Sequence, residues 1–326
     1  MSVNTGEPAA EPLHLLLFYA FISGFASDLL DGAGEHGPIA KYRRKSVART
    51  AGFSRAAPGC SELTIALALG GYLEDRVFLL GDQPTREWST TIIRDPVVTG
   101  SLLDVGRVLA GTPGAAWLGA GIGRSTQALV DWANSEGPPD LAAHESLLKV
   151  AEQASGEWWS APAGAGLPCT TRKLASFTAV ELICRDDSFG ETEAAVWDVS
   201  VNPSARVAEV HGLADWSRLV EAYPLDVTWS RGEQWSPRLG WKGPWLLPDW
   251  DRVARDWDGV HVTADAYLQS RGQMSRVRGG ATVLEGWDPD TTYWLSEAIM
   301  LAASSPETWV HEQDGPHDQS GWHRAA

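Results

Sequence analysis

The residues best suited to chemistry lie in the segment Val260-His261-Val262-Thr263, where apolar and polar side chains alternate. Because alternate side chains of a β-strand point to opposite faces, His261 and Thr263 are expected on one face and the two valines on the other. An imidazole that titrates near neutral pH, beside a hydroxyl on the same face, is typical of the floor of a functional site. The alternative is a structural histidine held by hydrogen bonds.

Anion binding is a second kind of chemistry that the sequence supports. The glycines in Leu118-Gly119-Ala120-Gly121-Ile122-Gly123-Arg124-Ser125 would let backbone N–H groups approach a phosphate, but the third glycine of the dinucleotide motif and the P-loop lysine are missing. The preferred interpretation is a flexible turn in which Ser125 caps a helix. Arg271, Arg276 and Arg278 could hold an anionic substrate through bidentate contacts. The basic run at 41–49 is interpreted as a solvated helix face or, alternatively, as a docking patch for an acidic partner or a nucleotide.

Tryptophan is concentrated in the second half of the chain, where fourteen of the seventeen lie from Trp158 onward. Seven of them fall within residues 216–257, and so many indoles either build an aromatic core or line a cleft that stacks a planar ligand. Core packing is the preferred interpretation for any single tryptophan. Trp158 and Trp159 would point to opposite faces of an extended segment, so one of them is expected to be exposed or at a cleft.

Metal chemistry has little support in the sequence. Cys60, Cys169 and Cys184 are far apart, and the eight histidines show no H-x-x-x-H or H-x-E pairing. The segment Asp288-Pro289-Asp290 is interpreted as a turn rather than as a divalent-cation loop. We therefore expect no metal ion, no disulfide framework and a reducing compartment.

The chain is acidic, with a formal charge of −16, and this balance disfavours general binding to nucleic acids. The apolar run from Leu13 to Ala26 is too short to span a bilayer, and Glu7 and Glu11 precede it where a signal peptide would carry basic residues. A cytoplasmic protein with no membrane partner is the expectation.

The periodicity of apolar residues predicts an α+β protein whose first half is mainly helical and whose second half is a mostly antiparallel, Trp-rich sheet with two short helices. The predicted domains are 1–155, 156–303 and a polar flexible tail at 304–326. Helices are predicted at Leu13–Leu30, Lys41–Thr50, Ser61–Tyr72, Leu102–Leu109, Ser125–Asn134, Asp140–Ala154, Asp215–Tyr223 and Asp249–Trp257. Extended segments are predicted at Arg76–Leu80, Thr90–Ile93, Phe177–Cys184, Glu193–Val201, Arg206–His211, Leu225–Trp229, Trp245–Leu247, Gly259–Thr263, Ala281–Gly286 and Thr292–Leu295.

A recurrent set of motifs covers residues 157–296 and resembles a family of uncharacterised proteins from actinomycete-type bacteria. This resemblance implies no particular activity. The motifs that carry it are Trp158-Trp159-Ser160, Thr170-Thr171-Arg172, Tyr223-Pro224-Leu225-Asp226-Val227-Thr228, Pro248-Asp249-Trp250, Asp258-Gly259-Val260-His261-Val262-Thr263 and Gly286-Trp287-Asp288-Pro289-Asp290.

The order of Arg172, His261 with Thr263, and Glu285 is also similar to the ADP-ribosyltransferase arrangement. This resemblance implies that Arg172 pairs with the pyrophosphate of NAD and that His261 or Thr263 fixes the nicotinamide ribose. It implies that Glu285 stabilises the oxocarbenium-like centre or orients the acceptor. The chain departs from that family in having no S-T-S triplet and no E-x-E or Q-x-E.

Two function classes follow from these residues. The first is a transferase that acts on a nucleotide-type ligand, with NAD as its cofactor, in a Trp-lined cleft of the second domain. The second is a non-catalytic accessory protein that binds a planar small molecule or a peptide, while the helical half docks a protein partner. For the transferase, the predicted catalytic residues are Glu285, His261 and Thr263, and the predicted cofactor-binding residues are Arg172, Trp159, Tyr267 and Trp287.

Overall fold

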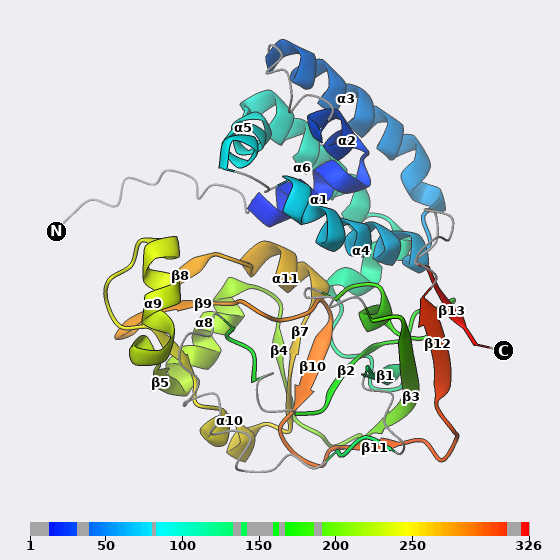
Figure 1. The fold of residues 1–326 in the computed structure, drawn as a ribbon, viewed down its shortest axis with the longest axis vertical. Helices are drawn as coiled ribbons and strands as arrows, with labels where there is room; N and C mark the ends of the chain where they lie inside the picture. Colours follow the sequence, from blue (N-terminus) through cyan, green and yellow to red (C-terminus); the bar gives the residue numbers. More distant parts are fainter. Residues whose placement is uncertain are drawn as a thin grey trace.

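Helices make up the N-terminal part of the computed structural model, which describes residues 13–30, 39–79, 83–132, 138–141, 159–162, 167–185, 191–311 and 321–325. In Figure 1 these helices gather on one side of the molecule, away from the sheet. The predicted helices at 13–30, 41–50, 61–72 and 102–109 are confirmed, with a break at Gly24 (φ 72°) inside the first. The elements are α1 (Leu13–Ile22), α2 (Phe25–Leu30), α3 (Ile39–Ala56), η1 (Ala57–Gly59), α4 (Glu62–Leu79), α5 (Gln83–Ile93), α6 (Pro96–Ala110) and η2 (Pro113–Gly119).

Helix α6 illustrates why this part of the sequence is helical. The Asp95 side chain caps it by accepting hydrogen bonds from the N–H groups of Val97 and Val98, and Pro96 occupies the first turn. Its buried side chains recur at intervals of three and four residues, so one face packs into the core. They are Val98, Ser101, Leu102, Val105 and Leu109.

Two short segments of this part were predicted as extended and are helical instead. Residues 76–79 complete α4 and residues 90–93 complete α5. Their β-branched and aromatic residues favour strands only weakly, and the packing of a whole helix overrides such local preferences.

The second part of the chain forms a mixed sheet in which the only parallel pair among the described strands is β4 with β7. The strand order is β13-β12-β3-β1-β2-β10-β7-β4, and β11 pairs with the C-terminal end of β3. The mostly antiparallel sheet of the predicted α+β class is therefore confirmed. The strands are β1 (Gln127–Asp131), β2 (Cys169–Arg172), β3 (Glu193–Val201), β4 (Val207–Val210), β7 (Gly259–Val262), β10 (Thr291–Trp294), β11 (Ile299–Leu301), β12 (Glu307–His311) and β13 (Trp322–Arg324).

Three sequence predictions differ from this sheet. Residues 127–131 form the central strand β1 rather than a helix. Ala128, Leu129 and Val130 are buried on both faces of the sheet, so the segment lacks the alternation of apolar and polar residues that predicts a strand. Residues 177–184 contain the 3-10 helix η4 (Val180–Leu182) instead of a strand. Within the predicted tail, 307–311 and 322–324 form the last two strands at one side of the sheet, where Trp309 packs on Phe177.

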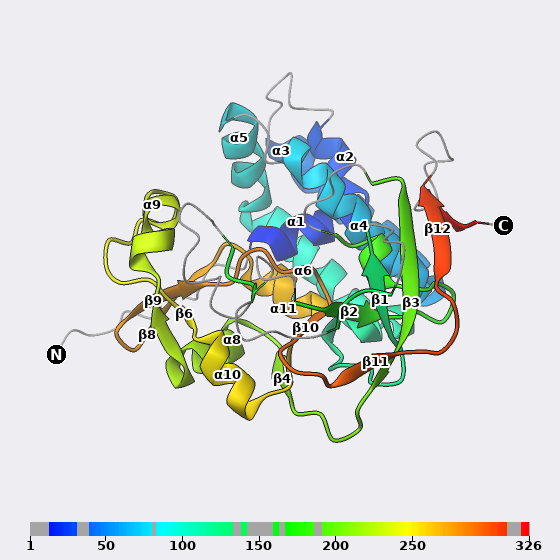
Figure 2. The same cartoon turned by 60° about the horizontal axis from the view of Figure 1, so that its bottom comes forward.

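Further helices and two small sheets lie beside one end of the main sheet, opposite β12 in both views (Figures 1 and 2). The predicted helices at 215–223 and 249–257 are confirmed, and Asp249 caps the second. Two other helices, at 228–239 and 264–270, were not predicted. The elements are α8 (Leu213–Ala222), β5 (Pro224–Asp226), α9 (Thr228–Leu239), β6 (Leu246–Pro248), α10 (Trp250–Asp256), α11 (Ala264–Ser270), β8 (Met274–Val277) and β9 (Gly280–Val283).

One hydrophobic cluster contains residues of both parts of the chain, from Phe18 and Tyr72 of the helices to Leu268 of α11. Helix α11 packs against both α1 and η2 and so joins the two parts. The predicted domain boundary near residue 155 falls outside the described residues. No helix among those described has the length and apolar character needed to cross a membrane.

Candidate functional site

The predicted site residues fall in two separate clusters. Arg172 and His261 meet at Asp290, on the main sheet. Glu285 lies near Tyr267 and Trp159, at a place where the N-terminal helices approach α9 and α11. The single cleft that the sequence predicted is thus divided between two places.

The first cluster, here called the ionic row, consists of Glu209, His261, Asp290 and Arg172. Strand register places Glu209 opposite His261, and the imidazole lies between two carboxylates. Its Nδ1 is 2.6 Å from Glu209 Oε2, and its Nε2 is 3.3 Å from Asp290 Oδ1. Asp290, which has a left-handed backbone (φ 59°), also accepts bonds from Arg172 Nε at 2.7 Å and Nη2 at 2.6 Å.

Charge alternates along the ionic row, and this favours the charged forms. Burial lowers the pKa of His261, but the hydrogen bonds and charges of Asp290 and Glu209 outweigh it, so the pKa is raised above 6.5. Burial raises the pKa of Glu209, and His261 reverses this, so that the pKa is lowered overall. The two neighbouring carboxyl groups therefore favour the protonated form of the His261 imidazole.

The glycine-rich segment is fastened to the ionic row. Arg172 Nη2 donates to the carbonyl oxygens of Ala120 and Gly121 at 3.1 Å, and the Ile122 N–H donates to Glu209 Oε1 at 3.0 Å. A backbone amide that already binds a carboxylate offers a poor place for a phosphate. The contacts with the ionic row thus explain why the glycine-rich segment is a structural turn. Strand β1 follows it, where Ser125 was expected to cap a helix.

Thr263 and Trp287 have structural surroundings. The Thr263 hydroxyl caps α11 by accepting from the Ala266 N–H at 3.0 Å. Trp287 is fully buried and packs against Trp216, Trp250 and the ring of Tyr293. These tryptophans are core residues, as the preferred interpretation had it. Trp229 is the exposed tryptophan of residues 216–257, at 62% exposure.

The second cluster, here called the Glu285 site, is built around a buried carboxylate. Glu285 follows β9 and is 2% exposed. Ser160 fixes its backbone: the Ser160 N–H and hydroxyl both donate to the Glu285 carbonyl oxygen, and the Glu285 N–H donates back to the hydroxyl, each at 2.8 Å. Next to it, Gly286 (φ 68°) leaves room for Trp159, whose Cδ1 would lie 2.5 Å from a Cβ there. The position of Glu285 is therefore closely defined.

Guanidinium groups approach this carboxylate from two helices. Arg238 Nη2 lies 3.1 Å from Glu285 Oε1, and Arg271 Nε lies 3.9 Å from Oε2. Arg271 also donates to the Tyr267 hydroxyl. Arg231 stands two turns before Arg238 on the same face of α9 and donates to the Trp159 carbonyl at 3.1 Å. Positive charge thus gathers locally in a protein whose net charge is strongly negative.

The N-terminal helices complete the Glu285 site. A Cβ atom on Gly272 would lie 3.6 Å from Glu285 Oε1 and 3.8 Å from His14 Nε2, so the two side chains face the same small space. The other imidazole nitrogen of His14 lies 2.6 Å from the hydroxyl of Tyr72, which is fully buried on α4. The Tyr72 contact holds the His14 ring in one orientation.

Sequence reasoning identified only part of this site. It selected Glu285, Trp159 and Tyr267 and noted Arg271, but it missed His14, Tyr72, Arg231 and Arg238. A histidine inside the apolar run Leu13–Ala26 was the one available signal for His14. The arrangement can bind an anion and can exchange protons through a carboxylate, an imidazole and a phenol.

Comparisons with protein-family models, with curated proteins and with solved structures gave no match. Among the described residues, no group of three or more His, Cys, Asp or Glu side chains is placed to hold a metal ion. The function must therefore be argued from the Glu285 site itself.

Proposed function

We propose that the protein is a transferase-like enzyme that binds a phosphate-bearing small molecule of the nucleotide type at the Glu285 site. The observation that carries this proposal is the convergence of Arg238 and Arg271 on one buried carboxylate, with Arg231 beside them. Guanidinium groups bind phosphate oxygens in a bidentate manner and are the preferred side chains for such ligands.

Arg238 offers the approach for the ligand. Its side chain is 50% exposed, whereas the side chains of Arg271 and Glu285 are buried. A phosphate that arrives from solvent would meet Arg238 first and compete with Glu285 for its guanidinium. That exchange would leave the carboxylate next to the ligand and able to act on it.

Glu285 and His14 are the proposed acid–base residues. They face one space from opposite parts of the chain, and the Ser160 and Tyr72 contacts hold each in position. Such support is what a group needs in order to transfer a proton to a bound ligand. In this proposal Arg172 and His261 maintain the fold and do not touch the ligand.

A ligand-binding protein without catalysis is the second candidate. The ion pairs of Glu285 with Arg238 and Arg271 favour it, since a carboxylate in this place can have the sole role of positioning the two guanidinium groups for a ligand. The two candidates make the same prediction for binding and differ in turnover.

The test is thermal unfolding with NAD, ADP or inorganic phosphate, followed by an assay for release of nicotinamide from NAD. A ligand at a hundred times its dissociation constant should stabilise the wild type by about 2.7 kcal/mol. Arg238→Ala should weaken binding by about tenfold, whereas the control Arg218→Ala, which removes an exposed arginine of α8, should leave it unchanged. Equal binding by both variants would overturn the site. Turnover that is lost in Glu285→Gln while binding persists supports the enzyme; binding without turnover in the wild type supports the second candidate.

A further inference from the structure

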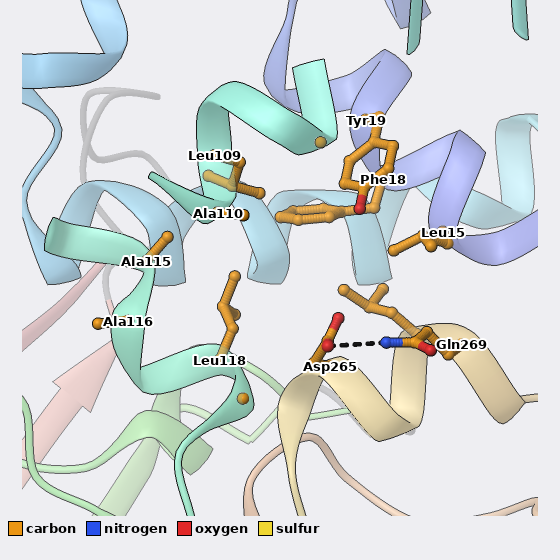
Figure 3. A pocket seen from close by; sticks show the side chains of 13 residues that line it. Leu15, Phe18, Tyr19, Leu109, Ala110, Ala115, Ala116, Leu118, Asp265 and Gln269 are labelled. Carbon is orange, nitrogen blue, oxygen red and sulfur yellow. Dashed lines mark hydrogen bonds between the residues drawn. The ribbon is translucent and has the colours of Figure 1, made fainter. Parts of the chain in front are cut away.

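A cavity of about 410 Å³ lies where α1, α6, η2 and α11 meet, apart from both clusters described above (Figure 3). Its volume is within the range of sites that hold small molecules. Leu109 and Leu118 are buried in its wall, whereas Ala110, Ala116 and Gly119 are exposed at its rim. A compact ligand can therefore enter from solvent and reach a deep apolar surface.

The wall of this cavity is well defined by packing. Tyr19 lies directly against Gly106, where a Cβ atom would come within 2.6 Å of the ring. Leu15 and Phe18 of α1 and Leu268 of α11 contribute further apolar surface. These side chains can pack against the apolar part of a ligand.

One carboxylate interrupts the apolar lining. Asp265 of α11 faces the space between Leu118 and Leu15 in Figure 3, and its Oδ2 accepts a hydrogen bond from Gln269 Nε2 at 2.7 Å. The amide of Gln269 is neutral, so this bond holds the carboxylate in place but does not neutralise its charge. A single fixed negative charge at the edge of an apolar cavity is the arrangement that selects a cation attached to an apolar body.

We propose that this cavity binds a compact apolar molecule that carries a protonated amine, with the amine against Asp265. The charge requirement is opposite to that of the Glu285 site, so the two proposals stand or fall separately. Helices α1 and α11 contribute to both places: His14 and Arg271 face Glu285, while Leu15 and Asp265 line the cavity.

The test compares three probes of similar shape and different charge: 2-phenylethylamine, 2-phenylethanol and 3-phenylpropionate. Binding to the full chain is measured by isothermal titration calorimetry at millimolar probe. The amine should bind at least about tenfold more tightly than the alcohol, because a charge-assisted contact replaces a neutral one. The carboxylate should be bound more weakly still. Absence of binding by the amine, or equal binding of amine and alcohol, would overturn the proposal.

Variants locate the probe. Asp265→Asn should weaken binding of the amine by about tenfold. Ala110→Trp should block the opening of the cavity and so prevent binding. Asp104→Asn removes an equal charge from an exposed position of α6 and should have no effect. Because Asp265 also stands in the first turn of α11, the stability of each variant is measured alongside. Amine binding that survives both Asp265→Asn and Ala110→Trp would place the probe elsewhere and refute the assignment.

Discussion

Replacing Glu181 by glutamine should stabilise the protein above neutral pH and have little effect in mild acid. Glu181 lies in η4, is 4% exposed and accepts a hydrogen bond from Trp132 Nε1 at 2.7 Å. The pKa of this carboxyl is raised from 4.5 to about 7, mainly because the group is buried; the Trp132 bond lowers it, the charge of Asp288 raises it and Arg185 lowers it, all within that net value. The side chain is thus neutral in the folded protein at pH values where the unfolded chain ionises it.

The sign and the size follow from proton linkage. Between 4.5 and about 7 the folded state binds more protons at Glu181 than the unfolded state, so the free energy of unfolding falls as pH rises through this window. At 1.36 kcal/mol for each pKa unit, the loss reaches about 3 kcal/mol above the folded pKa. Glutamine is neutral at every pH and still accepts the Trp132 bond. It should therefore remove the whole of this loss.

The assay is urea unfolding of the wild type and of Glu181→Gln at several pH values between about 5 and 8.5. The difference in free energy of unfolding should be small at the acid end and approach about 3 kcal/mol in favour of the variant at the alkaline end. Glu297→Gln, at an exposed position, is the control and should give a difference that does not change over this window. Parallel profiles for wild type and Glu181→Gln would refute the reasoning.

Two further substitutions test the clusters. Gly286→Ala should lower the free energy of unfolding by about 1–3 kcal/mol, because the new methyl meets Trp159 and the backbone is left-handed there; Gly100→Ala, where a Cβ has open space within α6, should raise it by up to about 1 kcal/mol, and equal effects in urea unfolding would contradict the packing. Arg172→Ala should lower the free energy of unfolding by about 3–5 kcal/mol, because Asp290 stays buried without its arginine partner. Phosphate binding to the refolded variant should be unchanged. A variant with wild-type stability would show that the ionic row does not support the fold.

Much of the fold could be predicted from periodicity, but a strand buried on both faces and the helices α9 and α11 could not. The amphipathic spacing of α6 and the alternation of β3 are visible in the sequence. Strand β1 is apolar on both faces, so its residues resemble a helix segment as closely as a strand. Helix α9 was hidden by Pro237 and by its polar composition. Helix α11 begins directly after β7 and its cap Thr263, so no turn residues separate it from the predicted strand.

The candidate site shows the same limit more sharply. Chemical type alone suggested Glu285 and His261, yet each finds partners that sequence distance conceals. Asp290 was interpreted only as part of a turn, although its left-handed backbone aims the carboxylate at both Arg172 and His261. His14 lies near Glu285, on the other side of Gly272, because α1 packs on α11, which is a property of the folded chain and of no single segment.

The contact of α1 with α11 also has a consequence for synthesis on the ribosome. Some 240 residues separate the two helices, and at about 5–20 residues per second the second emerges about 12–50 s after the first. During that interval the nascent helices can pack on one another, but the side of α1 that carries Leu15 and Tyr19 has no α11 to cover it. Chaperones that bind exposed apolar segments would find a target there, and slow translation of this protein should increase its dependence on them.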